Sequence, residues 1–481
     1  MSDLPAREEA LQLLEEENNA LIRHHLSLEP SELGEEAYEE ALREALEREG
    51  HLIRLREDSP HTYYAERLLR SRTLVTLEDT EEVMVYDEGA YHPHGEAVVR
   101  AWTEAAYRES EGKSPKSHLV NEVLAIVHRR TYVPRDGFNP PGLLCLRNGV
   151  LNPLTGELRP HAPEPRFTIQ LPVSFDSGAS CPRFLRFLGE VLPNEEGREI
   201  AQLLFGYTLE LGNRYHRAFM FHGSGANGKS TLQGVLRALL GPKSVSAETL
   251  QTLSKSRFAT ASLWGRLANI CPDIPATPLR YTDVFKGLTG GDAVRGERKF
   301  RDTFEFVNPA KLIFSANELP PVDDKTYAFW RRWIIVDFPN RFVGDDANPR
   351  LLETLTLDEE LSGVLNWALA GLDALRARGG FPEGQADDLR EEWQRRSDSL
   401  YWFLQERVEV DPQGWVAKAD FNEAYAAFCE AKDVAKRSIE LVGHQLPEHL
   451  AQVRTTRKRR GGPQVWGWAG IRLREEGEED G

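Results

Sequence analysis

Gly223-Ser224-Gly225-Ala226-Asn227-Gly228-Lys229-Ser230-Thr231 is the stretch that decides the fold of this chain. It fits the pattern G-x-x-x-x-G-K-[ST], in which glycines let backbone N–H groups turn toward a phosphate. The apolar run 218–222 predicts a buried strand before it, and residues 230–240 predict a helix after it. This order predicts an ATP site, with Lys229 on the β- and γ-phosphates and the Ser230 hydroxyl on Mg²⁺. The alternative is a glycine-rich turn that matches by accident.

The composition describes a soluble globular protein of two to four domains. The chain has 481 residues, of which 40% are hydrophobic and 28% are charged. No apolar run approaches the roughly 20 residues that span a bilayer, and the acidic N-terminus is not a secretory signal. The four scattered cysteines suit free thiols in a reducing cytoplasm. A net charge of -17 argues against a protein that coats nucleic acid, but it leaves room for a local basic groove.

Three further positions could complete the nucleotide site. Residues 266–273 predict a strand that ends in Asp273, a carboxylate placed to hold the Mg²⁺ water shell. Residues 311–320 predict a strand that leads to Asn317, whose amide could orient the attacking water. Arg331 and Arg332 precede another apolar run, where an arginine can stabilise a transferring phosphoryl group, often across a subunit boundary. Each position also has an ordinary structural explanation. Asp273 could be a common acid at the end of a strand, Asn317 a turn residue, and the arginine a structural residue paired with a carboxylate.

Positive charge gathers at two predicted hairpins. Residues 285–292 predict a glycine-marked turn, followed by a basic segment at 295–301. There Arg298, Lys299 and Arg301 could contact DNA phosphates, which supply most non-specific affinity, although a solvated basic loop explains the charge equally well. Helices over 399–406, 418–431 and 436–444 followed by a hairpin within 453–473 predict a winged helix. Its turn would present four cations to DNA, namely Arg457, Lys458, Arg459 and Arg460.

We expect six segments along the chain. They are an acidic helical N-terminal segment (1–60), a mixed α+β accessory domain (61–195), an ATPase core (196–345), a helical lid and linker (346–395), a winged-helix domain (396–474) and an acidic tail (475–481). Within them, residues 361–375 predict an amphipathic helix and residues 379–395 predict a linker.

Taken in order, the motifs resemble the superfamily 3 helicases of the phage/plasmid primase-helicase and poxvirus type, a branch of the AAA+ ATPases. The matching segments are 223–231, 267–273, 288–292, 314–320 and Arg331-Arg332, together with 146–158, 168–173 and 179–182 upstream. The resemblance implies an α/β fold with an AAA+ P-loop core. It also implies a hexameric ring that hydrolyses ATP at subunit interfaces and draws one DNA strand of a fork through its centre. One of the two arginines would be the finger supplied by a neighbouring subunit, and Arg298-Lys299 would lie in the pore.

Two departures from the family pattern matter. Many members carry two adjacent acids where this chain has Pro272-Asp273, so the acid that polarises the attacking water stays open, with Asp283 and Glu318 as candidates. Residues 1–80 are too short for the primase domain of many relatives. We therefore expect a helicase without primer synthesis, acting in replication of a phage, plasmid or integrated element in a bacterial or archaeal cytoplasm. A separate primase or replication protein is a candidate partner, and no membrane is expected.

Two other functions fit the same motifs. An ATP-switched factor could bind an origin or load a partner without unwinding, and a motor directed to RNA is a weaker alternative.

Overall fold

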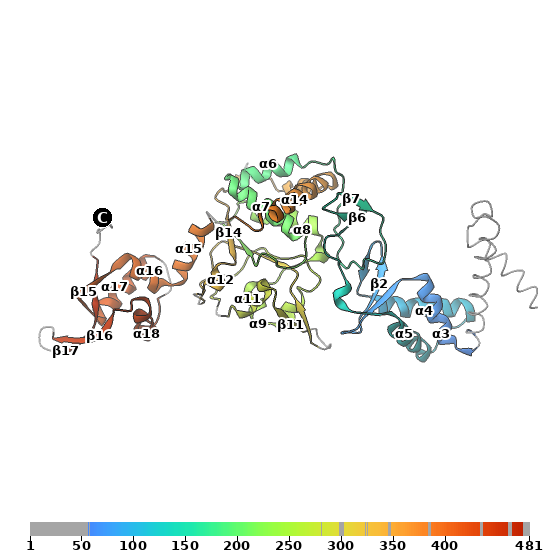
Figure 1. Cartoon of the computed structure of the whole chain (residues 1–481), viewed down its shortest axis with the longest axis horizontal. Helices are drawn as coiled ribbons and strands as arrows, with labels where there is room; N and C mark the ends of the chain where they lie inside the picture. The colour runs from blue at the N-terminus through green and yellow to red at the C-terminus, as the bar shows by residue number, and fades with distance from the viewer. Residues whose placement is uncertain are drawn as a thin grey trace, which may run out of the picture. The chain divides into compact units, whose positions relative to one another are not determined.

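The computed structural model describes residues 56, 58–279, 281–297, 303–322, 324, 326–344, 348–382, 386–432, 436–459 and 464–474. The chain divides into two compact units, one up to Phe138 and the other from Asn139 onward (Figure 1). Nearly all of the predicted acidic segment 1–60, and the tail 475–481, lie outside the described residues. In the part that is described, no helix is both long and apolar enough for a membrane span. All four cysteines are free and buried, as their scatter predicts.

The first unit is a small sheet covered by three helices. Its strand order is β3-β2-β1-β4, antiparallel except for the parallel pair of β1 and β4. In α5, Val120, Val123, Leu124 and Val127 recur at helical spacing and are buried, which docks that helix on the core. The elements are α3 (Pro60–Ser71), β1 (Leu74–Leu77), β2 (Val83–Asp87), β3 (Ala90–His92), α4 (Gly95–Glu111), α5 (Ser117–Thr131), β4 (Tyr132–Val133) and η1 (Arg135–Gly137).

The second unit is built on a five-stranded parallel sheet of order β14-β8-β13-β10-β9. The strands are β8 (Ala218–His222), β9 (Val245–Ser246), β10 (Ala268–Cys271), β13 (Lys311–Ala316) and β14 (Trp333–Asp337). Strands of a parallel sheet buried on both faces read as continuous apolar runs, which is how the sequence located β8, β10, β13 and β14. Successive side chains of β8 point to opposite faces of the sheet. Phe219 and Phe221 belong to one core cluster, and Ala218 and Met220 belong to the other.

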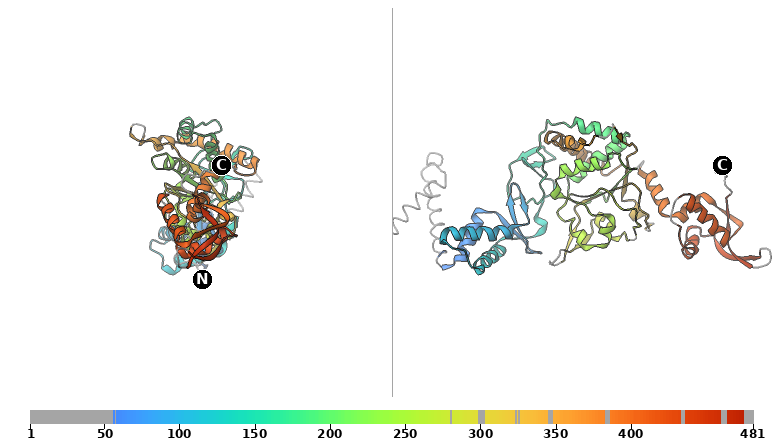
Figure 2. Two further views of the ribbon diagram at one scale, coloured as in Figure 1. Left: turned by 90° about the vertical axis from the view of Figure 1, so that its left-hand side faces the viewer. Right: turned by 180° about the vertical axis from the view of Figure 1, so that it is seen from behind.

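Helices cover both faces of this sheet. One layer holds α6 (Pro182–Val191), α7 (Glu195–Thr208), α8 (Lys229–Leu240) and α14 (Asp358–Arg378), and the other holds α9 (Leu250–Lys255), α10 (Arg257–Ala261), α11 (Asp283–Gly290) and α12 (Tyr327–Trp330). The reverse view in Figure 2 shows the same two layers. Further short elements of this unit are η2 (Pro242–Ser244), α13 (Leu351–Leu355) and a three-stranded sheet of β5 (Leu144–Leu146), β6 (Gly149–Asn152) and β7 (Glu157–Arg159). Residues 139–195, assigned from sequence to an accessory domain, share the first core cluster through Leu146, Phe184 and Leu188.

The basic segment after α11 forms a hairpin, as predicted. Strands β11 (Ala293–Gly296) and β12 (Phe304–Val307) pair antiparallel, and the connection at 298–302 lies outside the described residues. The glycine-marked turn predicted over 285–292 is wrong for most of its length. Those residues belong to α11, because Phe285 and Leu288 are one helical turn apart and both buried, and the chain turns only at Gly291 (φ +83°).

The linker predicted over 379–395 is also wrong. Residues 386–397 form helix α15 (Ala386–Ser397). Its Trp393 is 1% exposed and donates its indole N–H to the Pro320 carbonyl at 2.7 Å, beside Trp330 and Trp333. The burial of this tryptophan stabilises the packed helix although most of its residues are polar. The prediction from composition was therefore wrong.

The last part of the chain folds around its own core. The elements follow in the order α16 (Ser399–Arg407), β15 (Val408–Ala417), α17 (Lys418–Ala431), α18 (Ile439–His449), β16 (Arg454–Arg459) and β17 (Gln464–Leu473). The three helices and the closing hairpin were predicted, with α18 found later in the chain than expected. Strand β15 was missed, and it pairs with β17 to give the antiparallel order β15-β17-β16.

Candidate nucleotide-binding site

The loop between β8 and α8 has a conformation that only glycine can adopt at its key positions. Gly223, Gly225 and Gly228 have φ of +153°, +93° and +88°. A Cβ on Gly228 would stand 2.3 Å from Cγ1 of Val191, so a larger residue would also displace α6. The loop therefore packs closely against α6 at Gly228, and a side chain at this position would disturb that contact.

Lys229 is buried at the centre of this loop and is held by oxygen atoms. Its ammonium donates to the Gly223 carbonyl at 2.6 Å, to Oδ1 of Asn227 at 3.1 Å and to Oδ1 of Asn317 at 3.2 Å. No carboxylate of the described residues lies within ion-pair distance of it. Burial lowers the pKa of Lys229, and the charges of Asp273 and Asp337 only partly oppose that shift. The site thus holds a buried cation whose natural counterion would be a ligand anion.

A cavity of about 500 Å³ opens in front of Lys229. Residues 225–231 of the loop line it, together with Asp273 and Asn317. Because β8, β13 and β10 are parallel neighbours, their carboxyl ends meet at one edge of the sheet and bring these side chains together. The sequence did not predict the rest of the lining, which comes from α6, from the loop after β14 and from α13: Phe187, Glu190, Val191, Phe342, Asn348 and Leu351.

The oxygen donors in the cavity suit magnesium. Ser230 and Asp273 both line it and are exposed to solvent. No group of three or more acidic, histidine or cysteine side chains clusters anywhere in the described ranges. One hydroxyl and one carboxylate fit Mg²⁺, which keeps several waters and binds through few protein groups plus substrate phosphates.

The acids left open by the sequence lie in different places. Asp283 lines another cavity, beside β11, and Glu318 follows Asn317 but does not line the nucleotide cavity. The second acid of the cavity is Glu190, on the exposed side of α6. A sequence signal for it was lacking, because nothing in an amphipathic helix indicates which polar residue will face a ligand.

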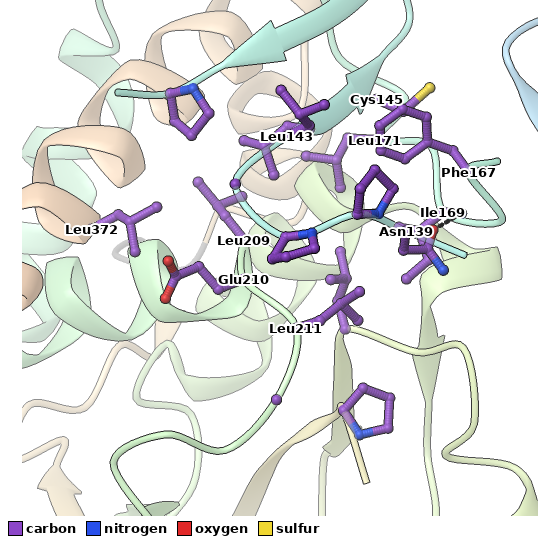
Figure 3. Close-up of a pocket in the computed structure, with 18 of the residues that line it drawn as sticks. Asn139, Leu143, Cys145, Phe167, Ile169, Leu171, Leu209, Glu210, Leu211 and Leu372 are labelled. Atoms are coloured by element: carbon purple, nitrogen blue, oxygen red, sulfur yellow. Dashed lines mark hydrogen bonds between the residues drawn. The ribbon is translucent and has the colours of Figure 1, made fainter. Parts of the chain in front are cut away.

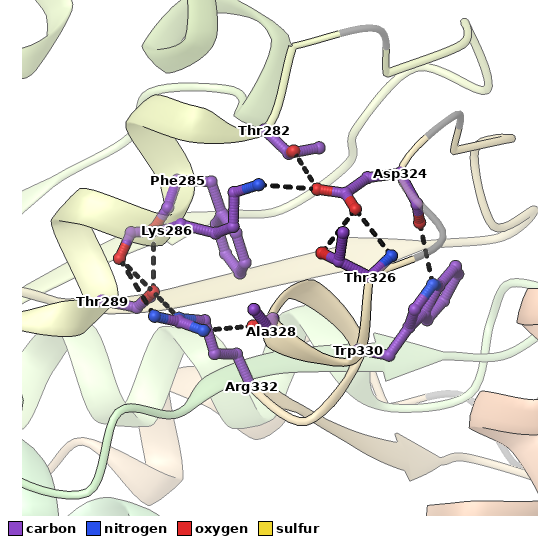
Figure 4. Close-up of polar contacts among 9 residues, drawn as sticks. All are labelled: Thr282, Phe285, Lys286, Thr289, Asp324, Thr326, Ala328, Trp330 and Arg332. Atoms are coloured by element: carbon purple, nitrogen blue, oxygen red, sulfur yellow. Dashed lines mark hydrogen bonds and ion pairs between the residues drawn. The ribbon is translucent and has the colours of Figure 1, made fainter.

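The two adjacent arginines have opposite environments. Arg331 is exposed, whereas Arg332 is 8% exposed and directs its guanidinium into the protein. Arg332 donates through Nε to Oγ1 of Thr289 at 2.9 Å and also bonds the Ala328 carbonyl (Figure 4). Neither arginine lines the nucleotide cavity of its own chain. The side chain of Arg332 is thus bonded within its own chain, whereas Arg331 has no side-chain partner among the described residues.

Arg332 belongs to a wider group that we call the Asp324–Arg332 cluster. Its members come from α11, from the residue that precedes this helix and from the segment before β14: Thr282, Lys286, Thr289, Asp324, Thr326 and Arg332 (Figure 4). The Asp324 carboxylate accepts hydrogen bonds from Lys286 at 2.9 Å, from the Thr326 hydroxyl at 2.6 Å and from the Thr282 hydroxyl. The cluster joins the helix in front of the β11–β12 hairpin to the segment that carries Arg331.

A second cavity, of about 490 Å³, lies away from the phosphate loop (Figure 3). Its walls are mostly apolar, including Leu143, Leu171, Leu209 and Leu372, and Glu210 is bonded to Arg376 at 2.6 Å. None of the phosphate-loop residues lines this cavity, and its two cations are Arg376, paired with Glu210, and the exposed Arg214. The phosphate-loop cavity is therefore the candidate nucleotide site.

Of the residues predicted to bind DNA, three are described. Arg457, Lys458 and Arg459 lie on β16 and are exposed, and the Arg457 guanidinium stands 3.9 Å from the ring centre of Trp466 on the paired strand. The predicted contacts Arg298, Lys299, Arg301 and Arg460 lie outside the described residues.

Comparison with known proteins adds two family matches. Residues 8–193 match a family described as D5 N terminal like, and residues 221–332 match a family of unknown function (DUF5906). The second match contains the phosphate loop, Asp273, Asn317 and both arginines.

Several curated relatives are viral proteins. "Putative helicase 121R" of Invertebrate iridescent virus 3 is 24% identical over 331 residues, which cover 60% of this chain and 34% of that protein. "Putative helicase L207/L206" of Acanthamoeba polyphaga mimivirus is 29% identical over 164 residues, covering 33% of this chain and 17% of that protein. The chain thus spans about a third or less of the length of the relatives it matches.

Among solved structures, the apo C-terminal region of NrS-1 has the same fold. It aligns with a TM-score of 0.50 at 13% identity and covers 85% of this chain and 98% of that one. The D5 N-terminal-like match and the viral relatives named as helicases together support a protein similar to the D5-like primase-helicases of phages and viruses.

Proposed function

We propose that this protein is an ATP-dependent helicase that moves along single-stranded DNA as a ring during replication. The observation that carries the proposal is the buried Lys229 ammonium, which faces a cavity of about 500 Å³ and has no carboxylate partner among the described residues. A buried cation without a counter-charge is costly unless a ligand supplies the anion. The parallel sheet with its phosphate loop after β8 supports the finer proposal of an AAA+ core.

The residues of the cavity have distinct roles in this proposal. Backbone N–H groups of the loop and Lys229 bind the β- and γ-phosphates of ATP. Ser230 and Asp273 hold Mg²⁺, which when bound neutralises charge on the phosphates. Asn317 touches Lys229 through its amide oxygen, so its NH₂ group can donate to the γ-phosphate or the attacking water. Glu190 and Asp273 are the acids placed to polarise that water.

Assembly would complete the site. Arg331 is exposed and does not line its own cavity, so it is free to reach the nucleotide of a neighbouring copy. An arginine finger supplied in this way ties hydrolysis to ring formation, and the family resemblance suggests six subunits.

DNA contacts are assigned to the two basic hairpins. Lys299 and its neighbours Arg298 and Arg301 would track the strand in the pore. The order helix–strand–helix–helix–strand–strand over 399–473 supports a winged helix, with Arg457, Lys458, Arg459 and Arg460 toward DNA phosphates. Lys299→Ala should lower unwinding while ATP hydrolysis without DNA continues, and normal unwinding would contradict the pore assignment.

The proposal is tested by Lys229→Ala, with ATP hydrolysis and strand displacement on a forked duplex measured in parallel. We expect both activities to be abolished together, because the same ammonium binds the phosphates on which both depend. Lys243→Ala is the matched control, since Lys243 is an exposed lysine of the same unit outside the cavity. Hydrolysis that survives Lys229→Ala would contradict the nucleotide site.

The second candidate is an ATP-switched factor that binds an origin or loads a partner. The basic hairpin β16–β17 favours it, because duplex binding does not require unwinding. The forked duplex separates the two functions: a loader hydrolyses ATP and displaces no strand, whereas a helicase does both.

A further inference from the structure

The cavity of about 490 Å³ in Figure 3, which we call the apolar cavity, lies at the opposite edge of the parallel sheet from the nucleotide site. Leu267 and Pro309 line it, and they come just before the amino ends of β10 and β13. Asp273 and Asn317 of the nucleotide cavity follow the carboxyl ends of the same two strands. Because parallel strands share one direction, a ligand in the apolar cavity and a bound nucleotide would occupy separate places.

The walls of the apolar cavity suit a small molecule with an apolar body. Most of its lining residues are leucine, proline, isoleucine, valine or phenylalanine. Two of them, Leu211 and Val307, are 38% and 54% exposed, so the cavity opens to solvent on their side. Pockets of between about 300 and 1,000 Å³ with walls of this kind typically hold small ligands, which a few polar groups orient.

Most polar side chains of the lining are already bonded to the protein. Asn139 accepts from two backbone N–H groups and donates to the Thr168 hydroxyl at 2.8 Å. Asn308 donates to two backbone carbonyls and accepts from one backbone N–H. Glu210 accepts from Nε and Nη2 of Arg376, at 3.0 and 2.6 Å. These groups can remain as they are when a ligand enters, and none of them adds a net charge to the cavity.

Arg214 differs from these residues. It is exposed, and among the described residues no carboxylate lies within ion-pair distance of its guanidinium. Its Cζ stands 5.8 Å from the ring centre of Tyr215, a contact that leaves its N–H groups available to an acceptor. A guanidinium can bind a carboxylate through two parallel hydrogen bonds. The apolar cavity thus combines apolar walls with one cation that has no acidic partner in the described part of the chain.

We propose that the apolar cavity binds a small carboxylic acid with an apolar body, and that Arg214 pairs with its carboxylate. The body would lie against Leu143, Leu171 and Leu209 (Figure 3). Burial of the apolar body supplies most of the affinity, and the exposed Arg214 determines the orientation. An alkyl and an aromatic body satisfy the same chemistry. The inference does not depend on the proposed function, because it uses no residue of the nucleotide cavity.

The first test is calorimetric titration of the full chain with decanoate, which has an alkyl body, and with naphthoate, which has an aromatic body. At least one of the two acids should bind, and it should bind about tenfold more tightly than its neutral amide, since only the acid can pair with Arg214. A saturating ATP analogue should leave this affinity unchanged. Absence of binding by both acids would overturn the proposal. Binding that is lost when the analogue is added would mean that nucleotide or a second copy closes the cavity, which also overturns it.

The second test locates the ligand. Arg214→Gln should reduce the affinity for the acid about tenfold, to that of the amide, and leave the amide unaffected. Leu211→Asp places a negative charge beside the carboxylate and should weaken the acid further. The matched controls Arg183→Gln and Leu185→Asp change exposed residues outside the cavity and should bind the acid like wild type. All four side chains are exposed, so the thermal unfolding midpoint should stay constant.

The outcomes of this test differ from those for the nucleotide site. An acid that binds equally well to wild type, Arg214→Gln and Leu211→Asp lies elsewhere, which overturns the assignment of the apolar cavity. Lys229→Ala should abolish ATP hydrolysis and still bind the acid, because the two cavities share no lining residue.

Discussion

The nucleotide cavity and the Asp324–Arg332 cluster are both built from charged side chains of the second unit, but they differ in how those charges are satisfied. In the cavity, Lys229 donates to three neutral oxygens and, in the part of the chain that the structure describes, to no carboxylate, and Asp273 is exposed. In the cluster, Asp324 accepts bonds from three side chains and Arg332 is bonded inside the chain. Buried charged side chains without a charged partner in the protein indicate a ligand site. Charged side chains that are bonded to one another indicate a group that stabilises the fold.

The difference gives a rule for substitutions. A change in the cavity, or at the free Arg331, should lower activity at nearly constant stability. A change in the cluster should lower stability first, because it leaves a buried polar group without its partner.

The sharpest case is the arginine pair. Arg331→Ala should reduce ATP hydrolysis by roughly 10³-fold, the usual contribution of an arginine finger, with an unfolding midpoint near that of wild type. Arg332→Ala should instead lower the midpoint, since it removes a buried side chain that bonds Thr289 and Ala328. Hydrolysis assays and thermal unfolding of both variants check this contrast.

Mixing experiments show whether Arg331 acts between copies. Arg331→Ala and Lys229→Ala are each inactive alone in our proposal, but a mixture can place an intact loop beside an intact finger. Partial recovery of hydrolysis on mixing is expected. Loss of activity in Arg332→Ala at full stability would reverse the assignment of the two arginines.

Most of what could be predicted from the sequence came from short motifs and from apolar runs that end in a polar residue. The phosphate-loop motif fixed β8 and α8, and apolar runs that end in a polar residue located β10 before Asp273 and β13 before Asn317. The parallel sheet then brings those residues to one edge, so spacing along the chain was enough to propose a shared cavity.

What could not be predicted depends on packing between distant segments. Glu190 lines the cavity because α6 packs behind the loop at Gly228, and no residue near Glu190 signals that contact. Arg331 and Arg332 are adjacent residues of the same type, and the sequence does not show that Arg332 is the one whose guanidinium bonds Thr289 and the Ala328 carbonyl. Helix α15 was interpreted as a linker because its apolar anchors, Trp393 and Leu389, are surrounded by charged residues in the sequence.

A substitution at Gly228 provides a second test of the nucleotide cavity. In Gly228→Ala, the new Cβ would clash with Val191 and the residue would keep a φ of +88°, so the loop should shift and ATP affinity fall about 100-fold. Gly212→Ala is the matched control, since Gly212 has a φ of +87° but open space around a Cβ. Nucleotide-binding titrations should find only the first variant impaired, and equal impairment of both would point to backbone strain alone.

The contribution of Asp324 to the Asp324–Arg332 cluster can be tested by the pH dependence of the free energy of unfolding. Burial alone would raise the pKa of Asp324, but hydrogen bonds from Thr282, Thr326 and Lys286 outweigh it and lower the pKa to about 2. A carboxyl with a depressed pKa in the folded state adds stability above its unfolded pKa of about 4, and that stability is lost as pH falls toward 2. Asp324→Asn should therefore unfold about 2 kcal/mol more easily at pH 7, with a gap that closes between pH 4 and 2. Urea titrations of both proteins across this range would measure the gap, and a constant gap would assign the loss to packing.

The smallest expected effect comes from Thr289, where the cluster meets the arginine pair. Thr289→Val keeps the shape of the side chain but removes the oxygen that accepts from Nε of Arg332, so the free energy of unfolding should drop by about 1 kcal/mol. Thr289→Ser retains the hydroxyl and should lose less. If Arg332 only stabilises the fold, hydrolysis per folded ring stays unchanged in Thr289→Val. If hydrolysis falls while the free energy of unfolding stays unchanged, the cluster positions Arg331 for the nucleotide of a neighbouring copy. Thr289 would then contribute to activity as well as to the stability of the fold.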